Sequence, residues 1–228
     1  RRFLADWYAG QVPESWGRGL VFQFNEATGD KRTSGTAAAL AGLGAARDDH
    51  EREKALARIF LLNALAYGWG GIPVIWSGDE LGMPNDPQWA QEAGHEGDNR
   101  WAHRPRLDWD VAAQRSDLRT DAGKIFQGLV HLGRVRAGLP QLHASAESLV
   151  FGEHVDRGLL ATLRTHPSGS MLAIYNVTED WRPFPGMEFE SIGFRNPVNA
   201  LGNDHAVAIG EDGFIWLPPF AAWWVVDR

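Results

Sequence analysis

Residues 72–76 read Ile-Pro-Val-Ile-Trp, and residues 77–80 that follow read Ser-Gly-Asp-Glu. A short, continuous apolar run between two helical segments is typical of a parallel strand that is buried on both faces. Strands of this kind occur in α/β folds, in which helices cover the sheet. We therefore expect residues 72–76 to form a buried strand of an α/β barrel or of a doubly wound sheet.

The segments on either side of this run carry helical signals. Asp48 and Asp49 supply an N-terminal cap and negative charge, and apolar residues then recur at helical spacing until residues 68–71, Gly-Trp-Gly-Gly. A second helix is expected from a cap at Thr120 to Gly138. The order helix, strand, polar loop, helix indicates part of an α/β protein.

The two ends of the chain have a different texture. Residues 1–47 are rich in turn signals and predict a loop-rich segment with a short helix at about residues 36–43. From residue 141 onward, short alternating runs separated by turn clusters predict an antiparallel β-sandwich. The expected strands are residues 148–151, 158–164, 171–176, 207–209, 213–217 and 223–226. Asn176 opens an Asn-Val-Thr sequon, but it falls inside one of these strands.

Composition excludes several classes of protein. The 228 residues are long enough for one to two domains, and 44% hydrophobic residues indicate a packed globule rather than a disordered chain. With 22 basic against 29 acidic residues, a nucleic-acid partner is not expected, and no apolar run is long enough for a membrane span. The absence of cysteine excludes disulfides, a thiol nucleophile and thiolate zinc sites.

The 11 tryptophans allow two interpretations. Aromatic rings can stack on sugars, but tryptophan is also a core residue, and the core interpretation is favoured. Five of them are expected in or beside core elements: Trp69, Trp76, Trp216, Trp223 and Trp224.

Two places could carry chemistry. Asp79 and Glu80 follow the expected parallel strand, where catalytic groups gather in α/β proteins, but a structural, hydrogen-bonded role is favoured because adjacent residues point in different directions. The loop of residues 85–106 is dense in polar residues and places Arg100 beside Trp101. It is either a sugar-binding loop or a solvated, salt-bridged surface loop. His95 and His103 do not have metal-ligand spacing, so we expect no zinc site.

Three motifs make the sequence similar to a known family. Residues 71–82, Gly-Ile-Pro-Val-Ile-Trp-Ser-Gly-Asp-Glu-Leu-Gly, resemble the last barrel strand of the α-amylase superfamily of glycoside hydrolases. Residues 28–38 and 97–106 resemble amylosucrases, which split sucrose, transfer its glucosyl group to an α-1,4-glucan and release fructose. The resemblance covers the whole chain, but only the C-terminal part of the family's protein. Trp76 departs from the tyrosine that is usual in these strands.

The resemblance implies the C-terminal part of a (β/α)8 barrel and three domain assignments. Residues 1–47 correspond to a partial subdomain inserted after barrel strand 7, residues 48–140 to the last helix, strand and helix of the barrel, and residues 141–228 to a C-terminal β-sandwich. It also implies that the catalytic carboxylates precede residue 1, so that none lies in this chain.

The resemblance further assigns binding roles to four residues. Arg100 corresponds to the arginine at the floor of the glucose pocket, which pairs with an upstream aspartate, and Gln23 and Arg32 correspond to residues on the fructose or acceptor side. Arg1, or its neighbour Arg2, corresponds to an arginine that contacts the oligosaccharide further out.

The implied partners are sucrose, an α-glucan acceptor and the remainder of the barrel, with no cofactor, metal, nucleic acid or membrane. The implied location is the cytoplasm, with secretion not excluded, and the oligomeric state stays open. A sucrose hydrolase shares these motifs, and a non-catalytic carbohydrate-binding fragment is the alternative of another class.

Overall fold

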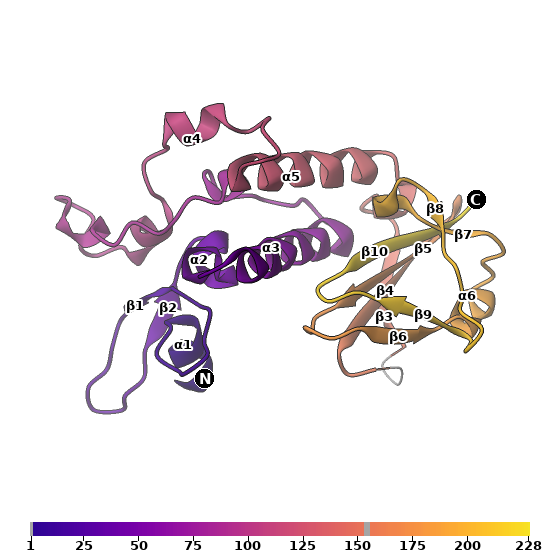
Figure 1. Ribbon diagram of the computed structural model, residues 1–228, viewed down its shortest axis with the longest axis horizontal. Coiled ribbons are helices and arrows are strands. Elements are labelled where there is room, and N and C mark those ends of the chain that lie inside the picture. The colour runs from indigo at the N-terminus through magenta and orange to yellow at the C-terminus, as the bar shows by residue number, and fades with distance from the viewer. Residues whose placement is uncertain (1, 153–155) are drawn as a thin grey trace. The chain divides into compact units, whose positions relative to one another are not determined.

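A computed structural model describes residues 2–152 and 156–228 (Figure 1). The chain divides into two compact units. The first unit comprises the described residues through Ile59 together with Val74–Gly128, and the second comprises Phe60–Pro73 together with Leu129–Arg228.

The second unit contains two antiparallel sheets. The larger has the strand order β3-β4-β5-β10-β7-β8, and the smaller pairs β6 with β9. The bounds are β3 Glu147–Phe151, β4 Leu159–His166, β5 Gly169–Asn176, β6 Arg182–Pro185, β7 Pro197–Asn199, β8 His205–Ala206, β9 Phe214–Leu217 and β10 Ala222–Asp227. The short helix α6, Met187–Ser191, follows β6, and the 3-10 turns are Pro140–Leu142 and Ala200–Gly202.

Both sheets share one hydrophobic core. Leu172 and Ile174 of β5 and Val225 of β10 pack in the same cluster as Phe184 of β6 and Ile215 of β9. Alternation places these side chains on the inner faces, because successive residues of a strand point to opposite sides. The expectation of antiparallel sheets is therefore confirmed.

The other face of β5 is covered by the second half of helix α3, which spans Asp49–Trp69. The Tyr175 hydroxyl donates to the carbonyl of Ala64 at 3.4 Å and accepts from the Trp224 indole nitrogen at 3.2 Å. Gly68 makes this close approach possible, since a Cβ there would lie 2.2 Å from the Tyr175 hydroxyl. Residues of β5 are consequently buried on both faces.

Some strand predictions were wrong at their limits. No strand covers residues 207–209, because the pairing with β7 extends only over His205–Ala206. Strand β6 was not expected, since Pro183 and Pro185 interrupt its sequence and proline is uncommon in strands.

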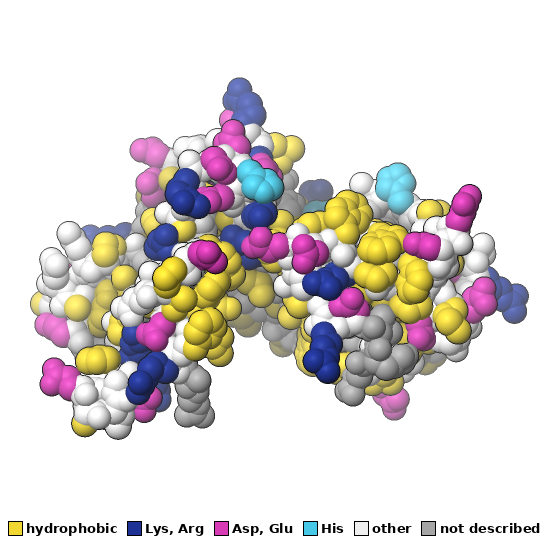
Figure 2. Space-filling model, turned by 60° about the horizontal axis from the view of Figure 1, so that its bottom comes forward, with side chains coloured by type: hydrophobic (Ala, Val, Ile, Leu, Met, Phe, Trp, Pro, Cys, Tyr) yellow, Lys and Arg dark blue, Asp and Glu magenta, His cyan; other side chains and the backbone are white. Residues whose placement is uncertain are grey.

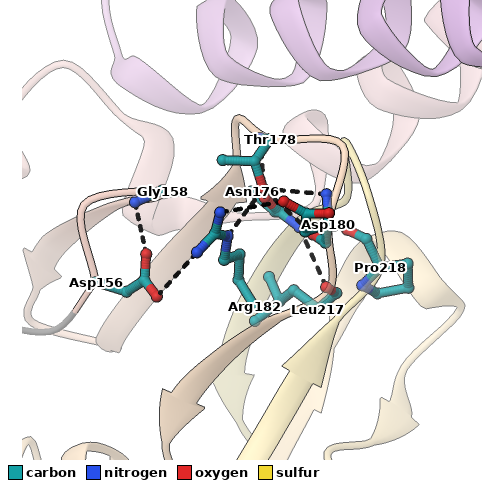
Figure 3. A network of polar contacts seen from close by, with 8 residues as sticks. All are labelled: Asp156, Gly158, Asn176, Thr178, Asp180, Arg182, Leu217 and Pro218. Atoms are coloured by element: carbon teal, nitrogen blue, oxygen red, sulfur yellow. Dashed lines mark hydrogen bonds and ion pairs between the residues drawn. The ribbon is translucent and has the colours of Figure 1, made fainter.

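Asn176 holds the end of β5 to the neighbouring turns (Figure 3). Its Nδ2 donates to the carbonyls of Asp180 and Pro218 at 2.7 and 2.8 Å and to that of Leu217 at 3.2 Å. Its Oδ1 accepts from the backbone N–H and the hydroxyl of Thr178 at 3.0 and 2.8 Å. The side chain of this sequon asparagine is therefore fully buried and occupied by structural hydrogen bonds.

The first unit is built from short helices, 3-10 turns and one hairpin. Its elements are α1 Arg2–Tyr8, β1 Leu20–Phe22, β2 Arg32–Ser34, α2 Ala37–Ala41, α4 Trp109–Ala113, the first parts of α3 and of α5 (Asp121–Ala137), and the 3-10 turns Leu43–Ala45, Asp79–Leu81, Trp89–Gln91 and Asn99–His103. The last of these turns is η4. Helices α2, α3 and α5 confirm the three helices expected from the sequence.

Local hydrogen bonds explain where these helices start. Thr36 caps α2 by accepting a hydrogen bond from the Ala39 N–H at 3.2 Å. Asp48 accepts from the Glu51 N–H at 2.8 Å, and Thr120 accepts from the Gly123 N–H at 3.0 Å. The caps that the sequence indicated at Asp48 and Thr120 are thus the ones that the structure uses.

The expectation of a buried parallel strand at residues 72–76 is wrong for this structure. Ile72 is 89% exposed, Val74 78% and Trp76 47%, and no strand is assigned to this segment. All strand pairs among the described residues are antiparallel. A parallel strand needs a neighbouring strand to satisfy its backbone, and no described segment pairs with residues 72–76 as a strand.

Candidate functional site

The β1–β2 hairpin of the first unit brings Gln23 and Arg32 to the same end. Phe22 pairs with Arg32 across the hairpin, and Gln23 is the next residue along the chain. Both side chains are exposed. Asn25 shapes the connecting loop, because its Oδ1 accepts from the N–H groups of Ala27 and Thr28 at 3.0 and 3.2 Å.

Hydrogen bonds connect this hairpin to the polar loop of residues 85–106. The Ser34 hydroxyl on β2 lies 2.7 Å from Nδ1 of His103, which is in η4. Asn85 accepts from the Thr36 N–H and donates to the carbonyl of Arg18, both at 2.7 Å. The strand that carries Arg32 therefore contacts the turn that carries Arg100.

Arg100 makes a two-pronged ion pair with Asp98. The distances are 2.7 Å from Nε to Oδ1 and 2.6 Å from the terminal nitrogen to Oδ2. Asp98 also caps η4 by accepting from the Arg100 N–H at 3.0 Å. These hydrogen bonds from Arg100 lower the pKa of Asp98 to about 2. The arginine side chain remains 63% exposed, so that an outward-facing part of its planar group can contact a ligand.

Two tryptophan rings lie close to the guanidinium of Arg104. Its guanidinium carbon lies 4.6 Å from the ring centre of Trp76 and 6.0 Å from that of Trp101, within the range of cation–π attraction. His95 stacks on Trp101 at 3.7 Å, and His103 meets Trp76 edge to face at 5.6 Å. Nε of Arg104 is buried and has no hydrogen-bond partner among the described residues.

The same environment shifts the titration of His103. Burial lowers the pKa of His103, and the positive charge of Arg104 lowers it further. A neutral imidazole at this position can exchange a hydrogen bond with Ser34, in either tautomer, without adding charge to the arginine-rich turn.

A pocket of about 260 Å³ opens beside this cluster. Its lining combines acidic, basic and aromatic side chains, namely Asp86, Glu92, His95, Trp101, Arg104 and Arg106. Arg106 and Glu92 form an exposed ion pair at 3.1 Å. Acceptors, donors and an aromatic ring in one small cavity suit a polyhydroxylated ligand, because each hydroxyl both donates and accepts.

The structure gives Asp79 and Glu80 supporting roles. Oδ1 of Asp79 accepts from the Ala37 N–H at 2.8 Å, which places it at the start of α2. Glu80 accepts from the Gly78 N–H at 2.7 Å. Burial raises the pKa of Asp79, and the hydrogen bond from Ala37 opposes that shift. This geometry agrees with the structural role favoured from the sequence.

Three further arginines complete the account of the candidate binding residues. Arg1 lies outside the described residues, whereas Arg2 donates to the carbonyl of Thr28 in the hairpin loop. Arg104 is the residue that the sequence analysis did not single out. The sequence indicates a contact between Arg104 and Trp101 only through their spacing of three residues. The contact between Arg104 and Trp76 depends on the fold.

No protein-family model matches the chain. Its fold is similar to that of several enzymes of the α-amylase superfamily. A crystal structure of AmyP in complex with maltose matches with a TM-score of 0.61 and 15% identity, over 83% of this chain and 38% of AmyP. The trehalulose synthase MutB matches at 0.52 and 16%, over 75% of this chain and 38% of the synthase.

An α-amylase from Anoxybacillus matches with a TM-score of 0.50 and 19% identity, over 78% of this chain and 35% of the amylase. The chain thus spans well under half the length of the enzymes that it matches. At identities this low, the likeness establishes the fold: an α/β arrangement with antiparallel sheets that matches the C-terminal part of amylase-family chains.

The described residues contain no group of three or more His, Cys, Asp or Glu side chains placed to hold a metal ion. None of their helices has both the length and the apolar character required to cross a bilayer.

Proposed function

We propose that this chain is the C-terminal portion of an amylosucrase-like glucosyltransferase that acts on sucrose, extends an α-1,4-glucan and releases fructose. The observation that carries the proposal is the combination of amylosucrase-like motifs with a fold shared by α-amylase superfamily enzymes. The AmyP structures with maltose and with maltotriose support a carbohydrate as the ligand class.

The proposed reaction is a double displacement with retention at the glucosyl carbon. A carboxylate attacks that carbon while a carboxylic acid protonates the departing fructose, and an acceptor hydroxyl then takes the glucosyl group from the enzyme. Both acids are assigned to the part of the protein that precedes this chain. The residues described above act on binding and on the choice of acceptor.

Arg100 is proposed to bind hydroxyls at the closed end of the glucose pocket. Its pairing with Asp98 supports this role, because the pair fixes the plane of the guanidinium before a ligand arrives. Arg32 and Gln23, exposed at the hairpin end, are proposed to hold the acceptor sugar and thereby favour glucan over water as the second substrate. Arg1 is proposed to contact the glucan further out.

The segment at residues 72–76 supports the proposal that the rest of a barrel lies beside it. The exposed apolar side chains of Ile72, Val74 and Trp76 are costly in water, and a neighbouring strand would cover them. We assign that neighbour to the remainder of the barrel, with residues 1–47 as the inserted subdomain, residues 48–140 as its last helix–strand–helix and residues 141–228 as the C-terminal sandwich.

The test is incubation of the complete protein with sucrose, following fructose, glucose and insoluble glucan. The proposal expects fructose in excess of glucose, together with glucan. Equal amounts of glucose and fructose without polymer would identify a sucrose hydrolase instead, and no release of fructose would refute sucrose as the substrate.

Arg100→Ala tests the binding site within that assay. We expect turnover to fall about 100-fold or more, as is usual when a substrate-positioning group is lost. Arg119→Ala is the matched control, because Arg119 pairs with Asp117 in the same geometry, at 2.8 and 2.7 Å, on an exposed turn of the same unit. Equal activity of the two variants would show that Arg100 is not in the glucose pocket.

A further inference from the structure

The smaller sheet of the second unit presents an apolar outer face. On β9, Ile215 and Leu217 point into the core, while Phe214 and Trp216 are 37% and 46% exposed. Pro185 and Pro183 lie directly opposite them on β6. Hydrophobic side chains are visible on the surface of the protein in Figure 2. Trp216 thus lies in a strand that contributes to the core, as expected, but its own side chain faces solvent.

We call Pro183, Pro185, Phe214 and Trp216 the aromatic platform. Residues two apart on a strand are about 7 Å apart and point to the same side. Phe214 and Trp216 can therefore each contact a successive ring of a chain molecule that runs along β9. Pro183 lies directly opposite Trp216 across the strand pair.

Asp212 fixes the orientation of the indole. Its Oδ2 accepts from the Trp216 ring nitrogen at 2.8 Å, and its Oδ1 accepts from the Phe214 N–H at 3.0 Å. The first of these hydrogen bonds is also the main cause that lowers the pKa of Asp212. A side chain that is held in place loses little conformational entropy when a ligand stacks on it.

The backbone of β6 argues against a further strand as the occupant. Proline has no N–H, so the ladder with β9 must be made by Arg182 and Phe184, and the proline nitrogens face the free edge. An additional strand would find no donor at Pro183 or Pro185.

The size of the platform argues against a second copy of this chain. A stable protein–protein interface buries about 800 Å² on each partner, from roughly 20–30 residues. The platform has four residues on a strand pair of four positions. Two exposed rings in a row along β9 match a narrow, chain-like ligand.

The rim of the platform indicates the chemistry of the ligand. The exposed carboxylates of Glu211 and Asp212 precede Phe214, and Trp181, 57% exposed, precedes β6. Carboxylates accept hydrogen bonds from hydroxyls and repel anionic ligands such as nucleic acids. A pyranose ring combines an apolar C–H face with a rim of hydroxyls and so matches both parts of this surface.

We propose that the aromatic platform binds an α-1,4-glucan chain, with Trp216 and Phe214 stacked on neighbouring glucosyl rings. The choice of glucan rests on the proposed function, because product and acceptor of that reaction are the same polymer. A platform of this kind keeps the growing chain attached to the protein between transfers.

The test is electrophoresis of the 228-residue chain through native gels that contain amylopectin, with dextran gels for comparison. We expect the chain to be retarded by amylopectin only. Trp216→Ala should weaken binding about tenfold or more, and Trp216→Phe less, because a smaller ring remains. Trp109→Ala is the matched control, since Trp109 is 76% exposed in the first unit.

Three outcomes would overturn the inference: no retardation of the parent chain, equal retardation of Trp216→Ala and Trp109→Ala, or a dimer in sedimentation that Trp216→Ala dissociates. Unchanged thermal unfolding of Trp216→Ala shows that lost binding is not lost folding. The gel assay uses no sucrose and is therefore independent of the sucrose assay. Glucan binding without fructose release would refute the proposed activity alone. Fructose release without glucan binding would refute the proposed role of the aromatic platform alone.

Discussion

Replacing Asn176 with alanine should lower the free energy of unfolding of the second unit by about 3 kcal/mol. The side chain is fully buried and takes part in five hydrogen-bond contacts (Figure 3). Its two N–H hydrogens make about two full bonds at one time, and Oδ1 accepts two more. At about 1 kcal/mol for each bond, the loss is about 4 kcal/mol, which a water molecule entering the vacated space reduces to about 3 kcal/mol.

The assay is urea unfolding followed by tryptophan fluorescence, since Trp224 is buried beside β5 in the same unit. Asn196→Ala is the matched control, because Asn196 is exposed in the same unit and only its backbone groups form hydrogen bonds among the described residues. It should stay within about 0.5 kcal/mol of the parent chain.

Asn176→Asp separates hydrogen bonding from volume. Aspartate has nearly the same size and keeps the acceptor for Thr178, but it loses both donors and faces three carbonyl oxygens with a charge. It should therefore destabilise at least as much as alanine at neutral pH. The reasoning is refuted if Asn176→Ala and Asn196→Ala have equal midpoints and slopes.

Three further predictions use the same unfolding measurement. Asp79→Asn keeps the acceptor for the Ala37 N–H and removes a partly buried charge, so it should be neutral or stabilising, whereas Asp79→Ala should cost about 1 kcal/mol; the reverse order would contradict the structural role. Burial lowers the pKa of His103 below 6.5, so the stability that the neutral imidazole contributes is complete above pH 6.5 and is lost as the pH falls through the folded-state pKa. His103→Gln should therefore reduce the decrease in unfolding free energy over this acidic range. An unchanged decrease would rule out His103 as its cause. Gly68→Ala places a Cβ 2.2 Å from the Tyr175 hydroxyl and should destabilise by about 1–3 kcal/mol, whereas Gly133→Ala, also inside a helix but with Tyr67 as its nearest neighbour at 4.0 Å, should be neutral or stabilising; equal losses for both variants would contradict the steric argument.

Local signals in the sequence predicted much of the secondary structure. The caps at Asp48 and Thr120 act on N–H groups of their own helices, and the strands β4, β5 and β10 follow from short apolar runs that are bounded by turn residues. Interactions of this kind join residues that are close in the sequence, so the pattern of residue types is sufficient to indicate them.

The candidate site could be predicted only in part from the sequence. Arg100 could be singled out from its loop, and Gln23 and Arg32 from a resemblance, but their placement on adjoining elements depends on the Ser34–His103 contact, across 69 positions of sequence. The enclosure of Arg104 by Trp76 and Trp101 has the same origin. Residue types alone do not specify which distant side chains meet.

Burial was decided by the tertiary structure. Trp216 and Trp224 both occupy apolar-looking strands, yet Trp224 is buried between β5 and α3 while Trp216 faces solvent on the outer side of β9. Residues 72–76 have the composition of a buried strand, yet Ile72, Val74 and Trp76 are exposed, because a strand is buried only where another element covers it. The sequence by itself determined the helices, the main strands and their alternation through local hydrogen bonds and periodicity. Which face of each strand becomes core, and which stays exposed to solvent, was decided by contacts between distant segments.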